Sequence, residues 1–205
     1  MESWETALKK TMDLVHGPLE REFRGEWCLI GSAATALQGI DVAPRDLDML
    51  ARRPEIVFRF AELMADFAPD TNPYPDDMER WLSSAEKPVK VDEPNLEEFV
   101  WHFGRWVVDG FEVEVAHIVP PAGMRFDDGM WEAGPKIWNH VKYAKLGNWD
   151  IPVVPLEIQL QTNLGRKLDS RVENIVRRFR ENGHDRELLG SALSEANRKR
   201  LEELL

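Results

Sequence analysis

The sequence has little of what several specialised protein classes need. One cysteine, Cys28, among 205 residues excludes an internal disulfide and a cysteine-ligated zinc site. No apolar run approaches the roughly 20 residues that span a bilayer, and the first residues, which include Glu2 and Glu5, lack the apolar segment of a signal peptide. We therefore expect no membrane partner and a cytoplasmic location, with Cys28 as a buried thiol.

Basic residues are also in short supply. Lys and Arg number 26 against 37 Asp and Glu, which gives a formal net charge of -11. Long nucleic acid is disfavoured as a partner, because non-specific binding to a phosphate backbone depends on Lys and Arg. The basic residues gather between Arg166 and Arg180, where a local positive face could survive the overall charge. We interpret this group mainly as a solvated helix face.

Several catalytic signatures are missing as well. The five histidines show no pair at metal-ligand spacing, and there is no P-loop, no GxSxG nucleophile elbow and no dinucleotide-binding glycine motif. What the chain does have is a hydrophobic content of 43% and eight tryptophans, which predict a folded globular protein. We interpret Trp101 and Trp106 as core residues, in preference to a platform on which bases stack.

One stretch, Trp27 to Leu50, carries most of the chemistry that the sequence contains. A short apolar run ends in Gly31-Ser32, and a small-residue helical segment and a loop then lead to an Asp-x-Asp pattern formed by Asp46 and Asp48. In an extended strand alternate side chains share a face, so Asp46 and Asp48 lie together while the residues between and after them face the core. Two neighbouring carboxylates repel each other unless a cation lies between them, and oxygen ligands suit Mg²⁺.

A β-hairpin is predicted between residues 99 and 118. Two largely apolar runs flank Asp109-Gly110, which is a strong signal for a two-residue turn. In the second run Glu112 and Glu114 alternate with apolar residues and so share one face. Glu114 is our preferred candidate for a third carboxylate beside the Asp-x-Asp pair, and Glu112 is the alternative. Both could instead be the solvated face of an antiparallel sheet.

These features resemble the nucleotidyltransferase superfamily that has the DNA polymerase beta-like fold. They look closest to its small prokaryotic branch, which holds AbiEii-toxin-like and minimal or antibiotic-modifying nucleotidyltransferases. In that superfamily a Gly-Ser or Gly-Gly turn precedes a helix, a loop and Asp-x-Asp on the next strand, and a third carboxylate follows on a later strand. Here Glu114 replaces the more usual Asp. The resemblance implies an α+β fold, with a mixed β-sheet, helices packed on one side and a C-terminal helical region.

The resemblance also implies an activity, the Mg²⁺-dependent transfer of a nucleoside monophosphate from a nucleoside triphosphate to an acceptor hydroxyl, with release of pyrophosphate. Asp46, Asp48 and Glu114 would hold the metal ions. Gly31 would allow close approach of the backbone, and Ser32, with the first amides of the following helix, would hold the terminal phosphates. The alternative for Ser32 is a helix cap.

A looser resemblance covers residues 151–176. Relatives run a Val/Pro strand into a helix that carries a phosphate-binding lysine, and the equivalent place here is near Asn163. Lys167 or Arg166 in the following turn would then make the contact with the nucleotide. The acceptor is left open between a protein, an RNA and a small molecule, and the oligomeric state is left open too. A second hypothesis is a binding or partner module that kept the fold and lost turnover, because both the third Asp and the lysine are replaced.

The chain is expected to have two parts. Residues 1–154 would form the catalytic part, with an irregular surface insertion at 68–95, and residues 155–205 would form a helical subdomain. Before the catalytic motif, apolar residues at helical spacing predict an amphipathic helix from Trp4 to about His16, ended by a Gly-Pro pair.

Overall fold

The computed structural model describes residues 3–92, 97–126, 128–132 and 134–204. Within them the strands are β1 (Trp27–Leu29), β2 (Asp46–Ala51), β3 (Lys90–Val91), β4 (Val100–Val108), β5 (Phe111–Val119), β6 (Lys142–Leu146) and β7 (Trp149–Val153). The α-helices of the same residues are α1 (Trp4–Glu22), α2 (Gly31–Leu37), α3 (Pro54–Leu63), α4 (Leu156–Gly165), α5 (Asp169–Asn182), α6 (Arg186–Ala192) and α7 (Glu195–Leu204). None of these helices is both long and apolar enough to cross a membrane.

The strands form one mixed sheet in the order β3-β4-β5-β2-β1-β7-β6. β2 runs parallel to β5 and β1 runs parallel to β7, while the other neighbours are antiparallel. The β4–β5 hairpin turns at Asp109 and Gly110, which have positive φ angles of 48° and 77°. Two consecutive residues with positive φ are the mark of the type I′ turn that suits a two-residue hairpin. The predicted hairpin and its turn are confirmed.

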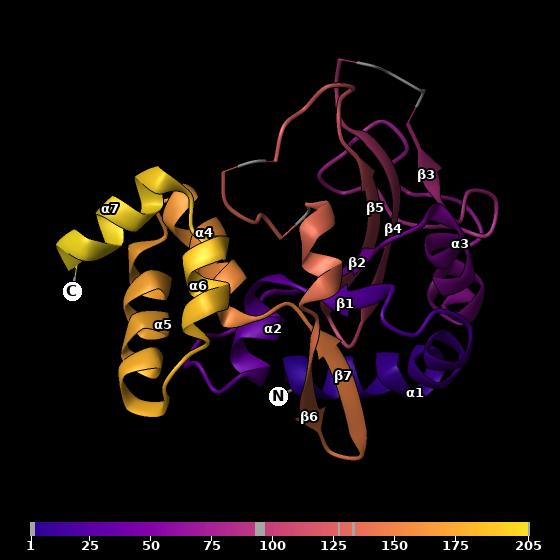
Figure 1. Ribbon diagram of the computed structural model, residues 1–205. Helices are drawn as coiled ribbons and strands as arrows, with labels where there is room; N and C mark the ends of the chain where they lie inside the picture. Colours follow the sequence, from indigo (N-terminus) through magenta and orange to yellow (C-terminus); the bar gives the residue numbers. More distant parts are fainter. Residues whose placement is uncertain (1–2, 93–96, 127, 133, 205) are drawn as a thin grey trace.

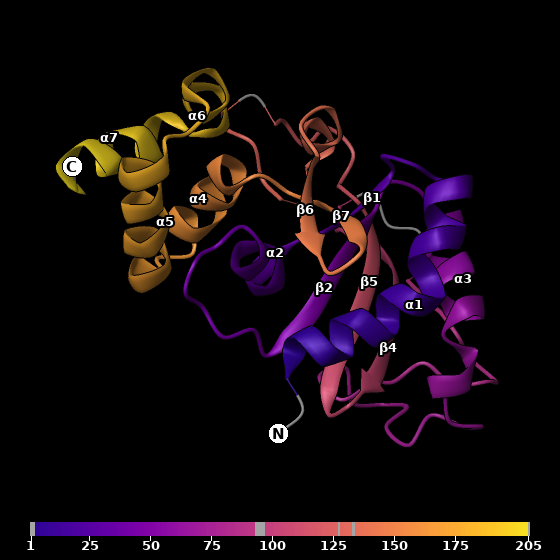
Figure 2. The same ribbon diagram turned by 90° about the horizontal axis from the view of Figure 1, so that it is seen from below.

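Helices cover both faces of the sheet, but over different strands. α1 and α3 pack on one face against the apolar side of β2, β4 and β5, where Phe60 and Trp106 meet with ring centroids 5.4 Å apart. The opposite face at β1 and β7 is covered by α4 and α6 (Figure 2). α5 and α7 pack on α4 and form a separate apolar cluster (Figure 1). The expected α+β architecture, a mixed sheet with a C-terminal helical region, is confirmed.

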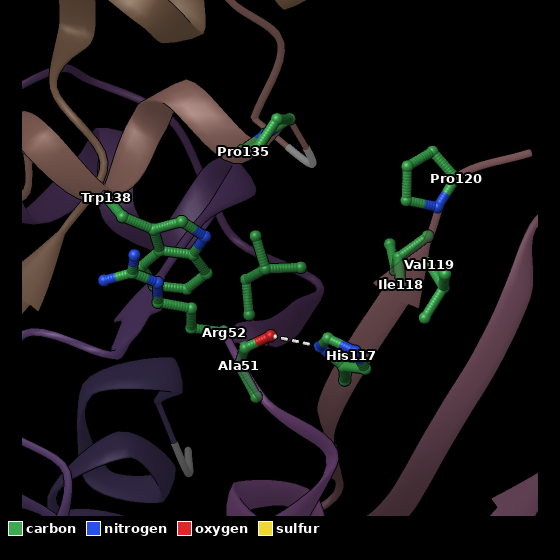
Figure 3. A pocket seen from close by; sticks show the side chains of 9 residues that line it. Ala51, Arg52, His117, Ile118, Val119, Pro120, Pro135 and Trp138 are labelled. Atoms are coloured by element: carbon green, nitrogen blue, oxygen red, sulfur yellow. Dashed lines mark hydrogen bonds between the residues drawn. The ribbon is translucent and has the colours of Figure 1, made fainter. Parts of the chain in front are cut away.

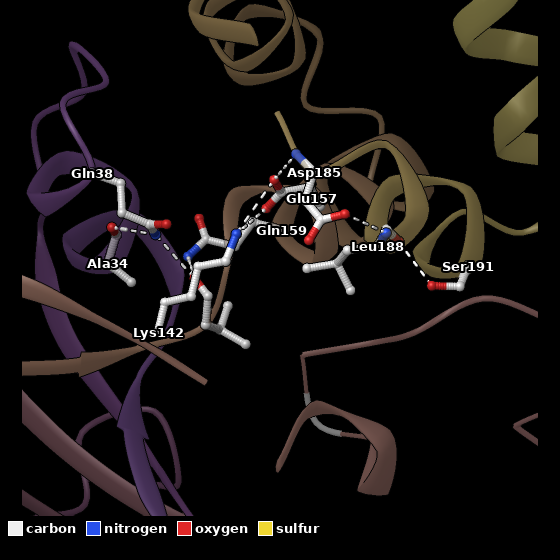
Figure 4. Close-up of polar contacts among 9 residues, drawn as sticks. Ala34, Gln38, Lys142, Glu157, Gln159, Asp185, Leu188 and Ser191 are labelled. Carbon is white, nitrogen blue, oxygen red and sulfur yellow. Dashed lines mark hydrogen bonds and ion pairs between the residues drawn. The ribbon is translucent and has the colours of Figure 1, made fainter. Parts of the chain in front are cut away.

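A buried carboxylate ties the C-terminal helices to the sheet. Glu157 in α4 is only 4% exposed, and its carboxylate lies 3.3 Å from Lys142 Nζ in β6. The same carboxylate accepts the backbone N–H of Asp185 at 3.0 Å (Figure 4). The Asp185 side chain in turn caps α6 by accepting the N–H of Leu188 at 2.9 Å. One acid therefore fixes the relative position of β6, α4 and the start of α6.

The first helix continues beyond its predicted end. A Gly-Pro pair usually stops a helix, yet α1 runs to Glu22 with Pro18 inside it. Leu19, in the next turn, is fully buried in the main apolar cluster. Burial of this last turn outweighs the backbone hydrogen bond that the proline cannot make.

Residues 68–95 are mostly irregular, as predicted, but they are not entirely a surface insertion. Trp81 is 2% exposed and packs on Phe103 of β4, with ring centroids 5.9 Å apart. Ser83 and Ser84 are also buried, and the Ser83 hydroxyl accepts the backbone N–H of Arg105 at 3.0 Å. The segment thus packs on β4 and stabilises it. Its last residues, 93–95, lie outside the described part of the chain.

Candidate active site

The parallel pairing of β2 with β5 brings the predicted carboxylates together. Its register places Asp48 beside Glu114 and Asp46 beside Glu112. Side chains of parallel neighbours in register point to the same face, so all four acids share the face of the sheet opposite α1 and α3. The expected convergence of Asp46, Asp48 and Glu114 is therefore present in the geometry, although the metal-binding role itself stays a prediction.

The cluster concentrates negative charge around Asp48. Burial, followed by the charges of Asp46 and Glu114, raises the pKa of Asp48 to about 7. Arg166 and Arg105 lower this pKa but do not cancel the effect. A carboxylate in such surroundings is stabilised by any cation that binds next to it.

Glu114 occupies the inner position and Glu112 the outer one. The Glu114 side chain is 22% exposed and its Oε1 lies 2.6 Å from Arg105 Nε, whereas Glu112 is 49% exposed and 3.9 Å from the same nitrogen. Burial raises the pKa of Glu114, while the charge and hydrogen bond of Arg105 lower it. The geometry favours Glu114 over Glu112 as the third carboxylate.

Gly31 and Ser32 both contact the acidic pair. Gly31 has a positive φ of 65°, and a Cβ atom at this position would lie 2.8 Å from Oδ2 of Asp48. The buried Ser32 hydroxyl donates to Oδ1 of Asp46 at 3.5 Å. The N-cap residue of α2 is Ile30, without a side-chain cap bond, so Ser32 is not the helix cap. Glycine is required at position 31 for two reasons, its φ angle and its distance from the carboxylate.

A further carboxylate, Glu132, joins the cluster from a loop and was not predicted. It accepts the backbone N–H of Gly31, and burial followed by the charge of Asp48 raises its pKa to about 7. Its own backbone N–H points to Thr162 Oγ1 of α4 at 3.4 Å. Glu132 follows Trp131, whose ring lies against Gly165, where a Cβ would come within 2.5 Å of the ring. No sequence signal could have found Glu132, because its loop has no periodic pattern.

Arg166 is the cation whose charge acts on the cluster from the α4–α5 turn. It lowers the pKa of Asp48 and of Glu132, and Arg171 also lowers that of Glu132. Lys167 is exposed with a positive φ of 57°, and in the described residues its ammonium makes no ion pair or hydrogen bond. Arg166 and Lys167 were the alternatives predicted to contact a nucleotide in this turn. Arg166 is the one whose charge lowers the pKa of the clustered acids, and the role of Lys167 stays a prediction.

This arrangement of strands and helices is similar to that of a solved structure. It is a crystal structure from Thermotoga maritima of a protein described as a "putative nucleotidyltransferase", with a TM-score of 0.52 and 22% sequence identity, over 85% of this chain and 91% of that chain. The two proteins share a fold. No family model matches the sequence, and no curated protein matches it. The likeness concerns the fold, so the activity has to be inferred from the site.

Aromatic side chains stand next to the acids. The residues that line a cavity of about 320 Å³ include the acids Asp48, Glu114 and Glu132 and the aromatic residues Trp101, Phe103 and Trp131. Trp101 is 39% exposed, so the prediction that it is a core residue is wrong, whereas Trp106 is buried as predicted. Apolar residues occupy both faces of β4, and the sequence pattern does not show which of them faces the sheet's helices.

Another cavity of about 350 Å³ lies at the C-terminal ends of β2 and β5 (Figure 3). Arg52 and Trp138 line it, together with His117, whose Nδ1 is hydrogen-bonded to the Ala51 carbonyl at 3.0 Å. No acid lines this cavity among the described residues. We therefore place the candidate site at the cluster around Asp48.

A ready-made metal cage is absent from the described residues. No group of three or more His, Cys, Asp or Glu side chains among them is arranged to hold a metal ion unaided. Glu114 is already paired with Arg105. Asp46 and Asp48, two residues apart on β2, are therefore the pair of acids on one strand that remains for a cation. The donor set is of the hard oxygen type that suits Mg²⁺, and the charge around Asp48 fits a cation there.

Proposed function

We propose that this protein transfers a nucleoside monophosphate from a nucleoside triphosphate to an acceptor hydroxyl, in a reaction that depends on Mg²⁺. The observation that supports this most is the convergence of Asp46, Asp48 and Glu114 from parallel neighbouring strands. They lie beside Gly31, where a Cβ atom would collide with Asp48. The fold shared with a protein described as a nucleotidyltransferase is consistent with the proposal.

The reaction asks little covalent chemistry of the protein. The acceptor oxygen forms a bond to the α-phosphorus, the bond from that phosphorus to the bridging oxygen breaks, and pyrophosphate leaves with the electron pair. The hydroxyl proton passes to a carboxylate, for which Glu114 is our candidate because it is the neighbour of Asp48 and lines the cavity of about 320 Å³ together with the aromatic side chains. Positioning and charge neutralisation supply most of the rate.

Asp46 and Asp48 are the residues that would hold a divalent cation, which would neutralise charge on the triphosphate. The phosphates would supply the further oxygen ligands, so the protein would need no complete cage of its own. On this account Gly31 lets the phosphates approach the backbone. Ser32 orients Asp46 through its hydroxyl, and Arg166 supplies positive charge from the C-terminal side. Lys167 is proposed as an outer phosphate contact.

The proposal is tested by measuring pyrophosphate release and transfer of an α-labelled nucleotide in the presence of Mg²⁺. Asp48→Asn should abolish metal-dependent release and leave the melting temperature no lower than that of the wild type. Asp150→Asn is the matched control, because Asp150 is an exposed strand acid that pairs with Lys145. Equal release by the wild type and Asp48→Asn would refute the proposal.

A binding module without turnover is the second candidate, and the Arg105–Glu114 ion pair favours it. An arginine that held Glu114 permanently would prevent that carboxylate from accepting a proton from the acceptor. Calorimetry separates the two functions. Binding of a nucleoside triphosphate with Mg²⁺, without release of pyrophosphate for any acceptor, would support the module.

A further inference from the structure

A row of aromatic side chains lies on the same face of the sheet as the acids. Trp101 and Phe103 alternate along β4 with residues of the other face, and the register places Phe103 beside Ala116 and Arg105 beside Glu114 of β5. On this face Phe103 is therefore the next side chain along β4 after Arg105, and Trp101 lies farther from the Arg105–Glu114 pair. We call Phe99, Trp101 and Phe103 the aromatic row.

The aromatic row borders two adjoining cavities that both reach Glu114. The first, of about 320 Å³, extends to Asp48. The second, of about 440 Å³, has Phe99, Trp101 and Phe103 in its wall together with Met78. Lys90, Asp92 and Arg105 line the second cavity as well, beside Glu114. Cavities of roughly 300 to 1,000 Å³ that combine aromatic side chains with a few polar groups are typical of small-molecule sites.

The rings are more exposed than their apolar character favours. Phe99 is 41% exposed and Trp101 is 39% exposed. A single exposed apolar residue is ordinary, but rings gathered in the wall of a cavity beside carboxylates mark a surface that a ligand covers. Large aromatic side chains are also those that contribute most to binding energy when they are covered.

Charged groups at the aromatic row are turned toward protein partners. Arg105 Nε lies 2.6 Å from Glu114, and its guanidinium stands 5.2 Å from the centroid of the Phe103 ring. Asp92 accepts the backbone N–H of Trp101 at 3.1 Å. Lys90 also lines this cavity, and its ammonium contacts the Met78 sulfur. The rings themselves present flat apolar surface, which favours a ligand with a flat ring system.

The position of the row relative to Gly31 indicates which substrate it would take. Gly31 and Ser32 follow β1, on one side of β2, whereas the aromatic row lies on β4, beyond β5 on the other side. In-line attack requires the acceptor and the leaving pyrophosphate to stand on opposite sides of the α-phosphorus. If the phosphates lie at Gly31, the acceptor lies at the aromatic row.

We infer that the aromatic row is the acceptor site, and that the acceptor is a small hydroxyl-bearing molecule with a flat ring system. This inference rests on the proposed function, because it assigns the second substrate of the same site. The net charge of -11 and the cavity volumes favour a small molecule over an RNA.

The binding step can be tested without nucleotide or metal. The probe is 2-naphthol, a flat ring with a hydroxyl, and cyclohexanemethanol is the non-planar comparison. Binding of each probe to the full chain is measured by saturation-transfer NMR. We expect saturable binding of 2-naphthol only, weakened roughly tenfold in Trp101→Leu because a stacked ring is lost. Phe103→Leu, which keeps an apolar side chain, gives a second variant, and circular dichroism checks that both fold.

Trp149→Leu is the matched control, because Trp149 belongs to the β6–β7 hairpin at the other end of the sheet. Its affinity for 2-naphthol should equal that of the wild type. Equal binding of both probes, or equal loss in Trp149→Leu, overturns the inference. Tighter binding of a single-stranded RNA that depends on Trp101 also overturns it. Because this experiment contains no triphosphate, a failure of pyrophosphate release refutes the proposed function separately.

Discussion

A methyl group on Gly31 would stand 2.8 Å from Oδ2 of Asp48, closer than carbon and oxygen can approach without one of them moving. The φ angle of Gly31 is 65°, in the left-handed region that side chains disfavour. The absence of a side chain at Gly31 therefore makes room for the Asp48 carboxylate. The position of Asp48 in β2 thus depends on a residue of α2.

Gly31→Ala should consequently displace Asp48. Nucleotidyl transfer is expected to fall at least about 100-fold, the scale that a misplacement of about 1 Å costs, while the unfavourable φ lowers the free energy of unfolding by about 1 to 2 kcal/mol. Gly110→Ala controls for the backbone term, because Gly110 has a φ of 77° and nothing within 4 Å of its Cβ position. Its variant should lose stability and keep its rate. Equal rates in the two variants would contradict this account of Gly31.

The raised pKa of Asp48 makes the stability of the metal-free protein depend on pH. Its pKa of about 7 in the folded protein is above the ordinary value of 3.8 for an aspartate, so the folded state binds more protons than the unfolded state between these values. The contribution of Asp48 to the free energy of unfolding is therefore greatest below pH 4, is lost as the pH rises toward 7 and changes no further above it, by up to about 4 kcal/mol at 1.4 kcal/mol per pKa unit.

Asp48→Asn should reduce this loss, because an amide does not ionise, and should make the metal-free protein more stable than the wild type at pH 8. Thermal denaturation in EDTA at pH 5 and pH 8 measures the effect. Adding Mg²⁺ at pH 8 should raise the melting temperature of the wild type and leave Asp48→Asn unchanged. If Asp48→Asn were less stable than the wild type at pH 8 in EDTA, ionisation of Asp48 would not destabilise the folded protein.

Arg105 should set the acidic limb of the pH–rate profile. Its charge and hydrogen bond lower the pKa of Glu114, so Arg105→Met should raise that pKa. If Glu114 must be ionised to take the proton, the acidic limb of kcat/KM moves to higher pH. Arg59→Met, which breaks exposed ion pairs with Glu22 and Glu62, should leave the profile in place. An acidic limb that moves to lower pH would exclude Glu114 as the base.

Gly165 provides a test of the unpredicted Glu132. A Cβ at Gly165 would lie 2.5 Å from the Trp131 ring, so Gly165→Ala should displace the ring and with it the adjacent Glu132. Helix propensity adds about 0.5 to 1 kcal/mol of stability for glycine to alanine, which offsets part of the steric cost. Transfer should fall while the melting temperature changes little.

Gly190→Ala in α6 is the control, because its Cβ position has nothing within 4 Å. It should be slightly more stable than the wild type with an unchanged rate. A fall in transfer of equal size in both variants would mean that the position of Trp131 is unimportant for the site.

Local patterns predicted the elements that local geometry determines. Alternation of period two placed Asp46 with Asp48 and Glu112 with Glu114, and the Asp-Gly pair fixed the hairpin between β4 and β5. These features depend on strand geometry and turn conformation, which the sequence displays directly. The meeting of Asp48 with Glu114 is different, because it depends on a parallel register between segments that are far apart in the chain.

Other features depended on packing that no local pattern reports. Trp101 is exposed because the helices cover the other face of β4, and Glu132 reaches the site because Trp131 docks on Gly165. α1 passes through Pro18 because burial of Leu19 favours one more turn. In each case a tertiary contact outweighs a local preference.

The central claim is that Asp46 and Asp48 hold a cation and the triphosphate beside Gly31. It is tested most directly by a crystal structure with a non-hydrolysable nucleoside triphosphate and Mn²⁺, in which anomalous scattering locates the metal. The account predicts an anomalous peak within about 2.3 Å of oxygens from both acids, a distance typical of hard cations, with the phosphates at Gly31. A nucleotide bound in the cavity of Arg52 and Trp138, with no peak at Asp46 and Asp48, would contradict it.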